Sequence, residues 1–268
     1  MNGTDYNRLE ININQKGRVF FINLLIKKRK RPFLFSGSGY GLVKSRLPGY
    51  HKMMERVFAI GDIHGCLDKI VPLMNMIKIN PAQDLLVFIG DYIDRGDHSR
   101  EVVDYLVDLK LRLPKSIFLL GNHEQMLLEY IDGRNIDAFL YNGGEKTLRS
   151  YVGSQSPGLP GAHNPWLPAA HQDFYRSLRP YFEWEDYVFV HAGLRNGVSL
   201  ENQDLFDLIW IREEFFYSDY DFGKKIVFGH TPFPQPFIHN QRIGIDTGAV
   251  YGNRLTCVEL PAVKFYAV

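Results

Sequence analysis

Five short polar segments of the sequence carry residue types that bind metal ions and transfer protons. Each segment follows a short apolar run, and together they contain six candidate metal ligands: Asp62, His64, Asp91, Asn122, His191 and His230. Imidazole nitrogens suit zinc, iron and other late metals, whereas carboxylate and amide oxygens suit harder ions such as manganese. Six ligands exceed the four of a tetrahedral zinc site and suit two ions that share a bridging carboxylate. The residue types therefore predict a two-metal centre.

These residues can meet only if the elements before them end at one edge of a sheet. Three apolar runs predict strands at Arg56–Ile60, Leu85–Ile89 and Ile117–Leu120. Apolar residues at helical spacing predict helices through Leu67–Ile77, through Val102–Leu113 with Ser99 as N-cap, and over about Glu124–Ile131. Strand–helix alternation with short connections predicts a βαβαβ unit with a buried parallel sheet, whose carboxyl strand ends form one rim.

The second half of the domain has a different pattern. Residues 153–170 are rich in Gly, Pro, Ser and Ala and predict a loop or cap. Later apolar runs predict strands at Tyr187–Val190, Lys225–Phe228, Arg242–Ile245, Leu255–Leu260 and Val263–Ala267. They favour a second, more antiparallel sheet, which would bring two further histidines to the same rim. Taken singly, each polar segment could be a turn, a helix cap or a hydrogen-bonded histidine, but five at five strand ends favour a metal site.

Charge divides the chain into two parts. Residues 1–52 hold 11 Lys and Arg against two acidic residues, a net charge of +9, while the remainder carries −8. We therefore expect a basic, poorly ordered or dispensable extension over 1–52 and one catalytic domain over 53–268. The run Lys27–Arg31 could instead bind nucleic acid or act as a nuclear address, but a solvated tail is the simpler interpretation.

Cysteine content and hydropathy bear on the compartment. Cys66 and Cys257 are the two cysteines, too few for a disulfide framework, which fits a reducing cytoplasm. The apolar run Val19–Ile26 is too short to cross a bilayer. Its basic residues follow it, the reverse of a secretory signal. The sequence thus predicts a cytoplasmic protein with no membrane partner, and it leaves the oligomeric state open.

The ordered motifs resemble those of a known family. Gly-Asp-Ile-His-Gly at 61–65, Gly-Asp-Tyr-Ile-Asp-Arg-Gly at 90–96, Gly-Asn-His-Glu at 121–124, His-Ala-Gly at 191–193 and Gly-His-Thr at 229–231 look like the signature of the phosphoprotein phosphatase (PPP) family of calcineurin-like metallophosphoesterases, bacterial-type Ser/Thr protein phosphatases in particular. The resemblance covers roughly residues 55–268. It implies an α/β fold in which two mixed β-sheets form a central sandwich flanked by helices, with the metal site at the strand C-terminal ends.

The resemblance also implies how the six ligands are shared between two divalent ions. Residues matching Asp62, His64 and Asp91 hold the first ion in the family. Those matching Asp91, Asn122, His191 and His230 hold the second, so Asp91 would bridge the pair. Manganese is the favoured metal, and iron or zinc remain alternatives.

Further roles follow from the same resemblance. His123 would be the proton donor to the leaving oxygen, with Asp94 as its partner, and Arg95 would bind two phosphate oxygens as a fork. Arg212 would be a second phosphate-binding arginine, unless it forms a surface ion pair with the acidic residues that follow it. Tyr251 resembles a residue of a loop that overhangs the substrate, although it could equally be a core aromatic.

The function implied is the metal-dependent hydrolysis of phosphate monoesters, chiefly phosphoserine and phosphothreonine in proteins, by a metal-bridging hydroxide with His123 as general acid. The nearest alternative is a symmetrical bis(5'-nucleosyl)-tetraphosphatase, whose members share the metal ligands. Asp94 and Glu124 together favour the protein phosphatase, because the tetraphosphatases typically lack the first and have Asp at the second. A more distant alternative is an inactive scaffold or an RNA-binding module. The expected partner is thus a phosphorylated protein or a dinucleoside polyphosphate, and nucleic acid is not favoured.

Overall fold

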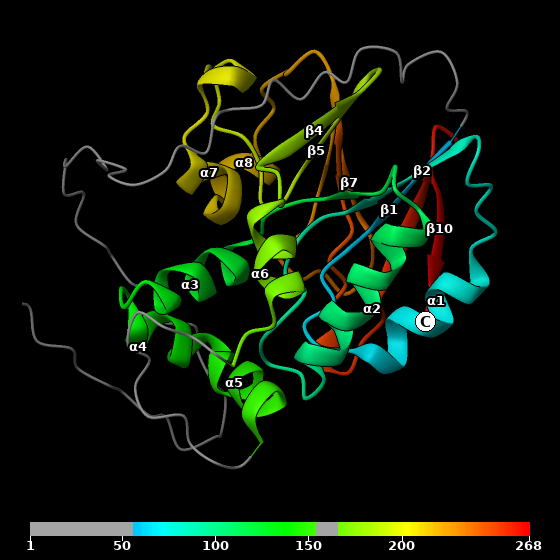
Figure 1. Cartoon of the computed structure of the whole chain (residues 1–268). Coiled ribbons are helices and arrows are strands. Elements are labelled where there is room, and N and C mark those ends of the chain that lie inside the picture. Colours follow the sequence, from blue (N-terminus) through cyan, green and yellow to red (C-terminus); the bar gives the residue numbers. More distant parts are fainter. Residues whose placement is uncertain (1–55, 154–165) are drawn as a thin grey trace, which may run out of the picture. The chain divides into compact units, whose positions relative to one another are not determined.

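The computed structural model describes residues 56–153 and 166–268, so the predicted basic extension and most of the predicted loop at 153–170 lie outside the described residues. Two five-stranded sheets lie at the centre (Figure 1). The first has the order β10-β9-β1-β2-β3, formed by Lys264–Ala267, Thr256–Leu260, Arg56–Ile60, Asp84–Phe88 and Ile117–Phe118. Strands β1, β2 and β3 are parallel, as expected, while β9 runs antiparallel to both of its neighbours.

The second sheet is mixed and less antiparallel than its sequence suggests. Its order is β4-β5-β6-β8-β7, formed by Tyr181–Trp184, Tyr187–Val190, Lys225–Phe228, Arg242–Gly244 and Phe237–His239. The central strands β5, β6 and β8 are parallel, and the edge strands β4 and β7 are antiparallel to their neighbours. The expectation of a more antiparallel sheet was wrong for two reasons. The chain between β5 and β6 forms a long helical crossover, which parallel pairing requires. The last two predicted strands, β9 and β10, form their antiparallel pairs in the first sheet.

Successive side chains along the strands pack on opposite faces of each sheet, which gives a sandwich of two sheets. In β1, Val57 and Ala59 pack between the two sheets, whereas Phe58 and Ile60 pack against the helices on the other face. Residues of the second sheet such as Phe189 complete the layer between the sheets. This period of two is what a strand buried on both faces requires. The predicted fold, two mixed sheets in a sandwich flanked by helices, is confirmed.

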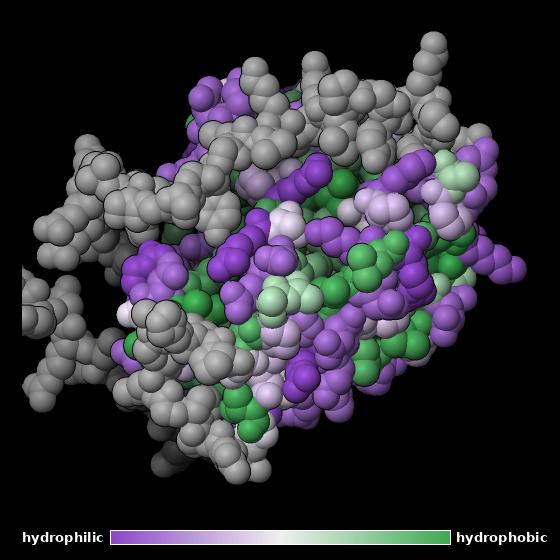
Figure 2. Space-filling model, viewed as in Figure 1, coloured by the Kyte–Doolittle hydropathy of each residue, from purple (hydrophilic) through white to green (hydrophobic). Residues whose placement is uncertain are grey.

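Helices cover the outer face of each sheet. The first sheet is covered by α1 to α6 and the π-helix η2, formed by Leu67–Met76, Ser99–Arg112, Asn122–Ile131, Ile136–Phe139, Glu145–Val152, Ala169–Arg176 and, for η2, Leu140–Gly144. The second is covered by α7, Leu205–Trp210, and α8, Glu213–Phe216. In Figure 1, α2 lies beside α5 and α6. Figure 2 shows hydrophilic residues among hydrophobic ones on this face, as expected of helices with one side in water.

Two expectations about helix ends need correction. Ser99 is the first residue of α2 and not its N-cap, which is His98; the Ser99 hydroxyl instead accepts the backbone N–H of Asp94. The predicted loop at 153–170 ends early, because α6 begins at Ala169. Among the described helices, none combines the length and the apolar character needed to cross a membrane.

Candidate metal and catalytic site

Three of the five polar segments leave their strands through unusual backbone conformations. His64, Asp91, Asp94, Arg95 and His230 all have positive φ, between 46° and 69°. Residues with a Cβ adopt this left-handed region at a cost of about 1–2 kcal/mol each, and such residues cluster at functional sites. The strand ends are therefore bent in ways that direct specific side chains, at the expense of local stability.

Two glycines show how closely the carboxylates approach the backbone. A Cβ at Gly121 would lie 2.2 Å from Oδ1 of Asp91, and one at Gly229 would lie 2.1 Å from Oδ1 of Asp62. Contacts this short are forbidden, so any other residue at either position would displace a carboxylate. Gly121, in the third polar segment, thus leaves space for Asp91 of the second. Gly229, in the fifth, leaves space for Asp62 of the first.

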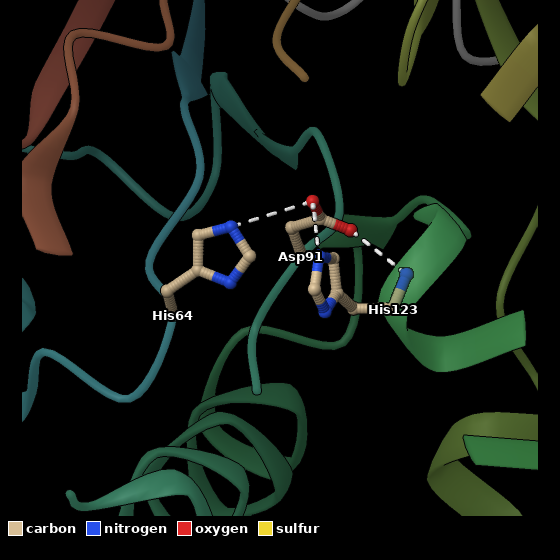
Figure 3. A group of neighbouring side chains, drawn as sticks. All are labelled: His64, Asp91 and His123. Atoms are coloured by element: carbon tan, nitrogen blue, oxygen red, sulfur yellow. Dashed lines mark hydrogen bonds and ion pairs between the residues drawn. The ribbon is translucent and has the colours of Figure 1, made fainter. Parts of the chain in front are cut away.

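One group of candidate ligands lies between β1, β2 and α3. Nε2 of His64 is 3.4 Å and Nε2 of His123 is 3.9 Å from Oδ2 of Asp91 (Figure 3). Nδ1 of His64 lies 2.7 Å from the carbonyl of Ile93, which can only accept, so Nδ1 carries the proton and Nε2 keeps a lone pair. Arg95 Nη1 donates to that lone pair at 2.7 Å. His64 cannot bind a cation through Nε2 while it holds this contact.

A second group shares Asp91. Oδ1 of Asp91 lies 3.3 Å from Nε2 of His191, and His230 belongs to the same group. The amide oxygen of Asn122 lies 3.0 Å from Nε2 of His191 and 2.9 Å from Nδ1 of His230. His191 donates its Nδ1 proton to the carbonyl of Ile89 at 3.0 Å, which leaves Nε2 as a ligand atom. All four residues predicted for the second ion are thus brought together, and Asp91 lies between the two groups.

The predicted role of Asp62 as a ligand of the first ion stays a prediction. Asp62 belongs to neither group of converging ligands, and His123 stands with His64 and Asp91 instead. One oxygen of Asp62 accepts the backbone N–H of His230 at 2.9 Å, while Oδ1 is buried with no hydrogen-bond partner among the described residues. Burial, with the charges of Asp246 and Asp91, raises the pKa of Asp62 well above its usual value. Uncompensated buried oxygens and crowded carboxylates fit a site for divalent cations.

Asp246 is a site residue that sequence reasoning missed. It is 6% exposed and lies close enough to Asp62 to raise the pKa of that carboxyl. Burial raises the pKa of Asp246 itself to about 6. The signal was present, because Asp246 follows the predicted strand Arg242–Ile245 as the other candidates follow theirs. The rule that located the other acids would also have located this one.

His123 and Asp94 form a buried pair. Nδ1 of His123 lies 2.6 Å from Oδ2 of Asp94, and both side chains are fully buried. Burial lowers the pKa of His123 to about 3 and raises the pKa of Asp94 well above its usual value. The short contact requires one proton between Nδ1 and Oδ2. Nε2 of His123 is buried and has no hydrogen-bond partner among the described residues.

Glu124 ties two strand ends together. Its carboxylate accepts the backbone N–H groups of Asp91 at 2.9 Å, Tyr92 at 2.8 Å and Gly121 at 3.1 Å. Burial and the charge of Asp91 raise the pKa of Glu124 to about 8, and the bonds from Tyr92 and Asp91 oppose this shift. Glu124 therefore fixes the end of β2 against the start of α3, where Asp91 and His123 must meet. The sequence marked Glu124 as a difference between two branches of the family but did not reveal this contact.

The two candidate phosphate-binding arginines lie at the rim. Nη1 of Arg212 donates to the hydroxyl of Thr231 at 3.0 Å, and the ion-paired arginine nearby is Arg195, which holds Glu214 at 2.9 Å. The surface ion pair considered for Arg212 is thus not formed among the described residues. Arg95 lies over the ring of Tyr251 at 5.8 Å. Tyr251 is 64% exposed, so it is not a core aromatic.

The fold and the site together define a metallophosphoesterase. Residues 55–258 match the family described as calcineurin-like phosphoesterase, which is most of the chain. The chain belongs to the calcineurin-like phosphoesterase family, as its motifs predicted.

Individual relatives divide between two kinds of substrate. The chain is 29% identical over 234 residues to the asymmetrical bis(5'-nucleosyl)-tetraphosphatase PrpE of Halalkalibacterium halodurans, covering 78% of this chain and 92% of the relative. A structure of a candidate diadenosine tetraphosphatase aligns with a TM-score of 0.60 and 21% identity, covering 81% of this chain and 94% of that one. A protein serine/threonine phosphatase from Saccharomyces cerevisiae aligns with a TM-score of 0.55 and 17% identity, covering 81% and 80%. The two structures establish the fold alone.

Proposed function

We propose that the protein hydrolyses phosphate monoesters of poor leaving groups, with phosphoserine and phosphothreonine in proteins as the substrate class. The observation that carries this proposal is the buried His123–Asp94 pair, whose free Nε2 faces Asp91. An alkoxide leaves readily only if it is protonated as the bond breaks, and a positioned acid supplies about 10²–10⁴-fold of rate. Phosphoanhydrides and nitrophenyl esters leave as stabilised anions and gain little from such an acid.

Each group of side chains has a role in this proposal. Divalent cations would be held by the six predicted ligands, without His123. They would neutralise the phosphate oxygens and make water a nucleophile near neutral pH. Asp91 lies between the groups, and its position is set by Glu124. His123 donates a proton from Nε2 to the leaving oxygen, and Asp94 holds the ring in orientation. Arg95 and Arg212 bind the equatorial phosphate oxygens, where charge develops.

The role of Arg212 leads to a prediction. Replacing Arg212 with Ala is expected to lower kcat/KM for nitrophenyl phosphate by roughly 10–100-fold, because a hydrogen bond to a charged group contributes about 1.5–3 kcal/mol. Arg212→Lys should recover only part, since an ammonium cannot form a fork. Steady-state kinetics with inorganic phosphate as competitor would measure both. The matched control is Arg195→Ala, because Arg195 is held by Asp207 and Glu214 and should not contact phosphate. Equal kinetics in wild type and Arg212→Ala would move the role elsewhere.

A second candidate function is the hydrolysis of dinucleoside tetraphosphates. The supporting observation is the identity to PrpE, whose name specifies asymmetrical cleavage and not the symmetrical cleavage weighed from the motifs. One feature of the rim would suit such a substrate. The rings of Phe206 and Trp210 are stacked with centroids 6.2 Å apart, and Trp210 contacts His230 edge to face at 5.7 Å. Phe206 is 62% exposed, so a nucleobase could stack there while its phosphates reach the site.

A substrate panel separates the two candidates. We expect kcat/KM to be higher for a phosphoserine or phosphothreonine peptide than for diadenosine tetraphosphate, with the protein stripped of metal and each of Mn²⁺, Fe²⁺ and Zn²⁺ restored in turn. A phosphotyrosine peptide and nitrophenyl phosphate serve as references. Faster release of ATP and AMP from diadenosine tetraphosphate would make the second candidate the function. Absence of bound metal and of turnover on every substrate would instead support an inactive scaffold.

A further inference from the structure

The carboxylate of Asp94 is held from behind by a hydroxyl group. Oγ1 of Thr147 donates to Oδ1 of Asp94 at 2.5 Å and accepts the backbone N–H of the same residue at 2.9 Å. The Ser99 hydroxyl lies 3.1 Å from Thr147 Oγ1 and also accepts the Asp94 N–H. All three residues are fully buried. The oxygen that Thr147 holds is the one that does not contact His123, so the two bonds together fix both oxygens of Asp94.

The helix that carries Thr147 is itself held at its other end. Thr147 and Tyr151 are four residues apart on α5, so they share a face. The Tyr151 hydroxyl contacts Nδ1 of His171 on α6 at 2.7 Å, and Nε2 of His171 contacts Asp104 on α2 at 2.9 Å. These bonds tie the end of α5 to α6 and, through His171, to α2.

The segment before α5 touches the same loop. The carbonyl of Gly143, in η2, accepts the backbone N–H of Arg95 at 3.3 Å. Gly143 has φ of 102°, and a Cβ there would lie 2.8 Å from the Arg95 nitrogen. Residues 143–147 thus contact two consecutive residues of the loop, Asp94 and Arg95. Both of these residues have a strained left-handed backbone conformation.

We propose that Thr147 is a positioning residue for the His123–Asp94 pair, so that the helical segment 140–152 controls the efficiency of leaving-group protonation. This inference rests on the proposed role of His123 as general acid. A carboxylate that turned about its Cβ–Cγ bond would lose its alignment with Nδ1, and the imidazole would then be free to rotate. The Thr147 hydroxyl prevents this turn, because it has one proton to donate and the nearest ionisable acceptor is Oδ1 of Asp94.

Replacing Thr147 with Val, which has the same shape, tests the proposal. We expect kcat for a phosphoserine peptide to fall about tenfold, the change that corresponds to the loss of one hydrogen bond. The rate on nitrophenyl phosphate should stay within about twofold. KM and the metal content per chain should be unchanged, and Thr147→Ser should restore the rate on the peptide. Should the valine variant fail to fold, Thr147→Ala also removes the hydroxyl group and places no methyl group where the hydroxyl was.

Two controls separate a positioning role from a structural one. Tyr266→Phe removes a partly buried hydrogen bond to Glu259 from the edge strand β10, and it should lower the melting temperature without selecting between the two substrates. In a His123→Asn background, Thr147→Val should have no further effect on kcat, because the two residues act as a unit. An equal loss on both substrates, no rescue by Ser, or additive losses in the double variant would overturn the proposal. If His123→Asn alone does not select between the substrates, the proposed function fails independently of Thr147.

Discussion

Replacing Asp91 with Asn is expected to leave the protein with less than one equivalent of divalent metal and to lower turnover by roughly 10³-fold or more, since several kcal/mol of charge stabilisation would be lost. Asp91 is the one residue common to both ligand groups. Its Oδ1 lies 3.3 Å from His191 and its Oδ2 3.4 Å from His64. An amide offers one oxygen and no charge, so neither orientation of Asn could serve both groups.

Elemental analysis of desalted protein, alongside kcat for nitrophenyl phosphate, measures this effect. Asp108→Asn is the matched control, because it removes one carboxylate from an exposed ion pair with Arg112 and should change neither quantity. Circular dichroism would confirm that both variants are folded. An Asp91→Asn protein that keeps two metal ions, or that retains turnover within about tenfold, would remove the basis for a shared bridging ligand.

Local sequence patterns predicted the part of the site that depends on strands. β1, β5 and β6 have the predicted bounds, since an apolar run that ends in glycine or in a polar cluster is a local signal. Each ligand lies directly after such a run, so its place in the fold follows from the strand before it. His191 and His230 show this, since they follow β5 and β6 and both contact Asn122.

Contacts between elements distant in the sequence could not be predicted this way. Thr147 lies 53 residues from Asp94, and no periodicity indicates that α5 contacts the loop after β2. The surroundings of Asp62 show the same limit. Its motif indicates a ligand, but it does not reveal that one oxygen accepts the backbone N–H of His230, 168 residues away. The order of the motifs along the chain identifies the residues of a site, but it does not show which of their atoms face one another.

His123 belongs both to a buried pair with Asp94 and to a group of possible metal ligands. Its Nδ1 is held by Asp94 at 2.6 Å, as expected of a general acid. Its Nε2 lies 3.9 Å from Asp91, within a group that could bind a metal. A ligand nitrogen must be deprotonated, whereas an acid must carry a proton at the same atom. One atom cannot do both at once, so metal content and leaving-group dependence decide between the two roles.

Replacing His123 with Asn is expected to preserve the metal content and to lower kcat for a phosphoserine peptide by roughly 10²–10⁴-fold, the usual contribution of a general acid. The loss on nitrophenyl phosphate should be less than about tenfold, because nitrophenolate leaves without a proton. Asp94→Asn should show the same selectivity with a smaller loss, since an amide can still orient the ring. Both variants can be compared on esters whose leaving groups span a range of pKa values. A steeper dependence of rate on leaving-group pKa in the variants supports the acid; equal losses together with loss of metal would make His123 a ligand instead.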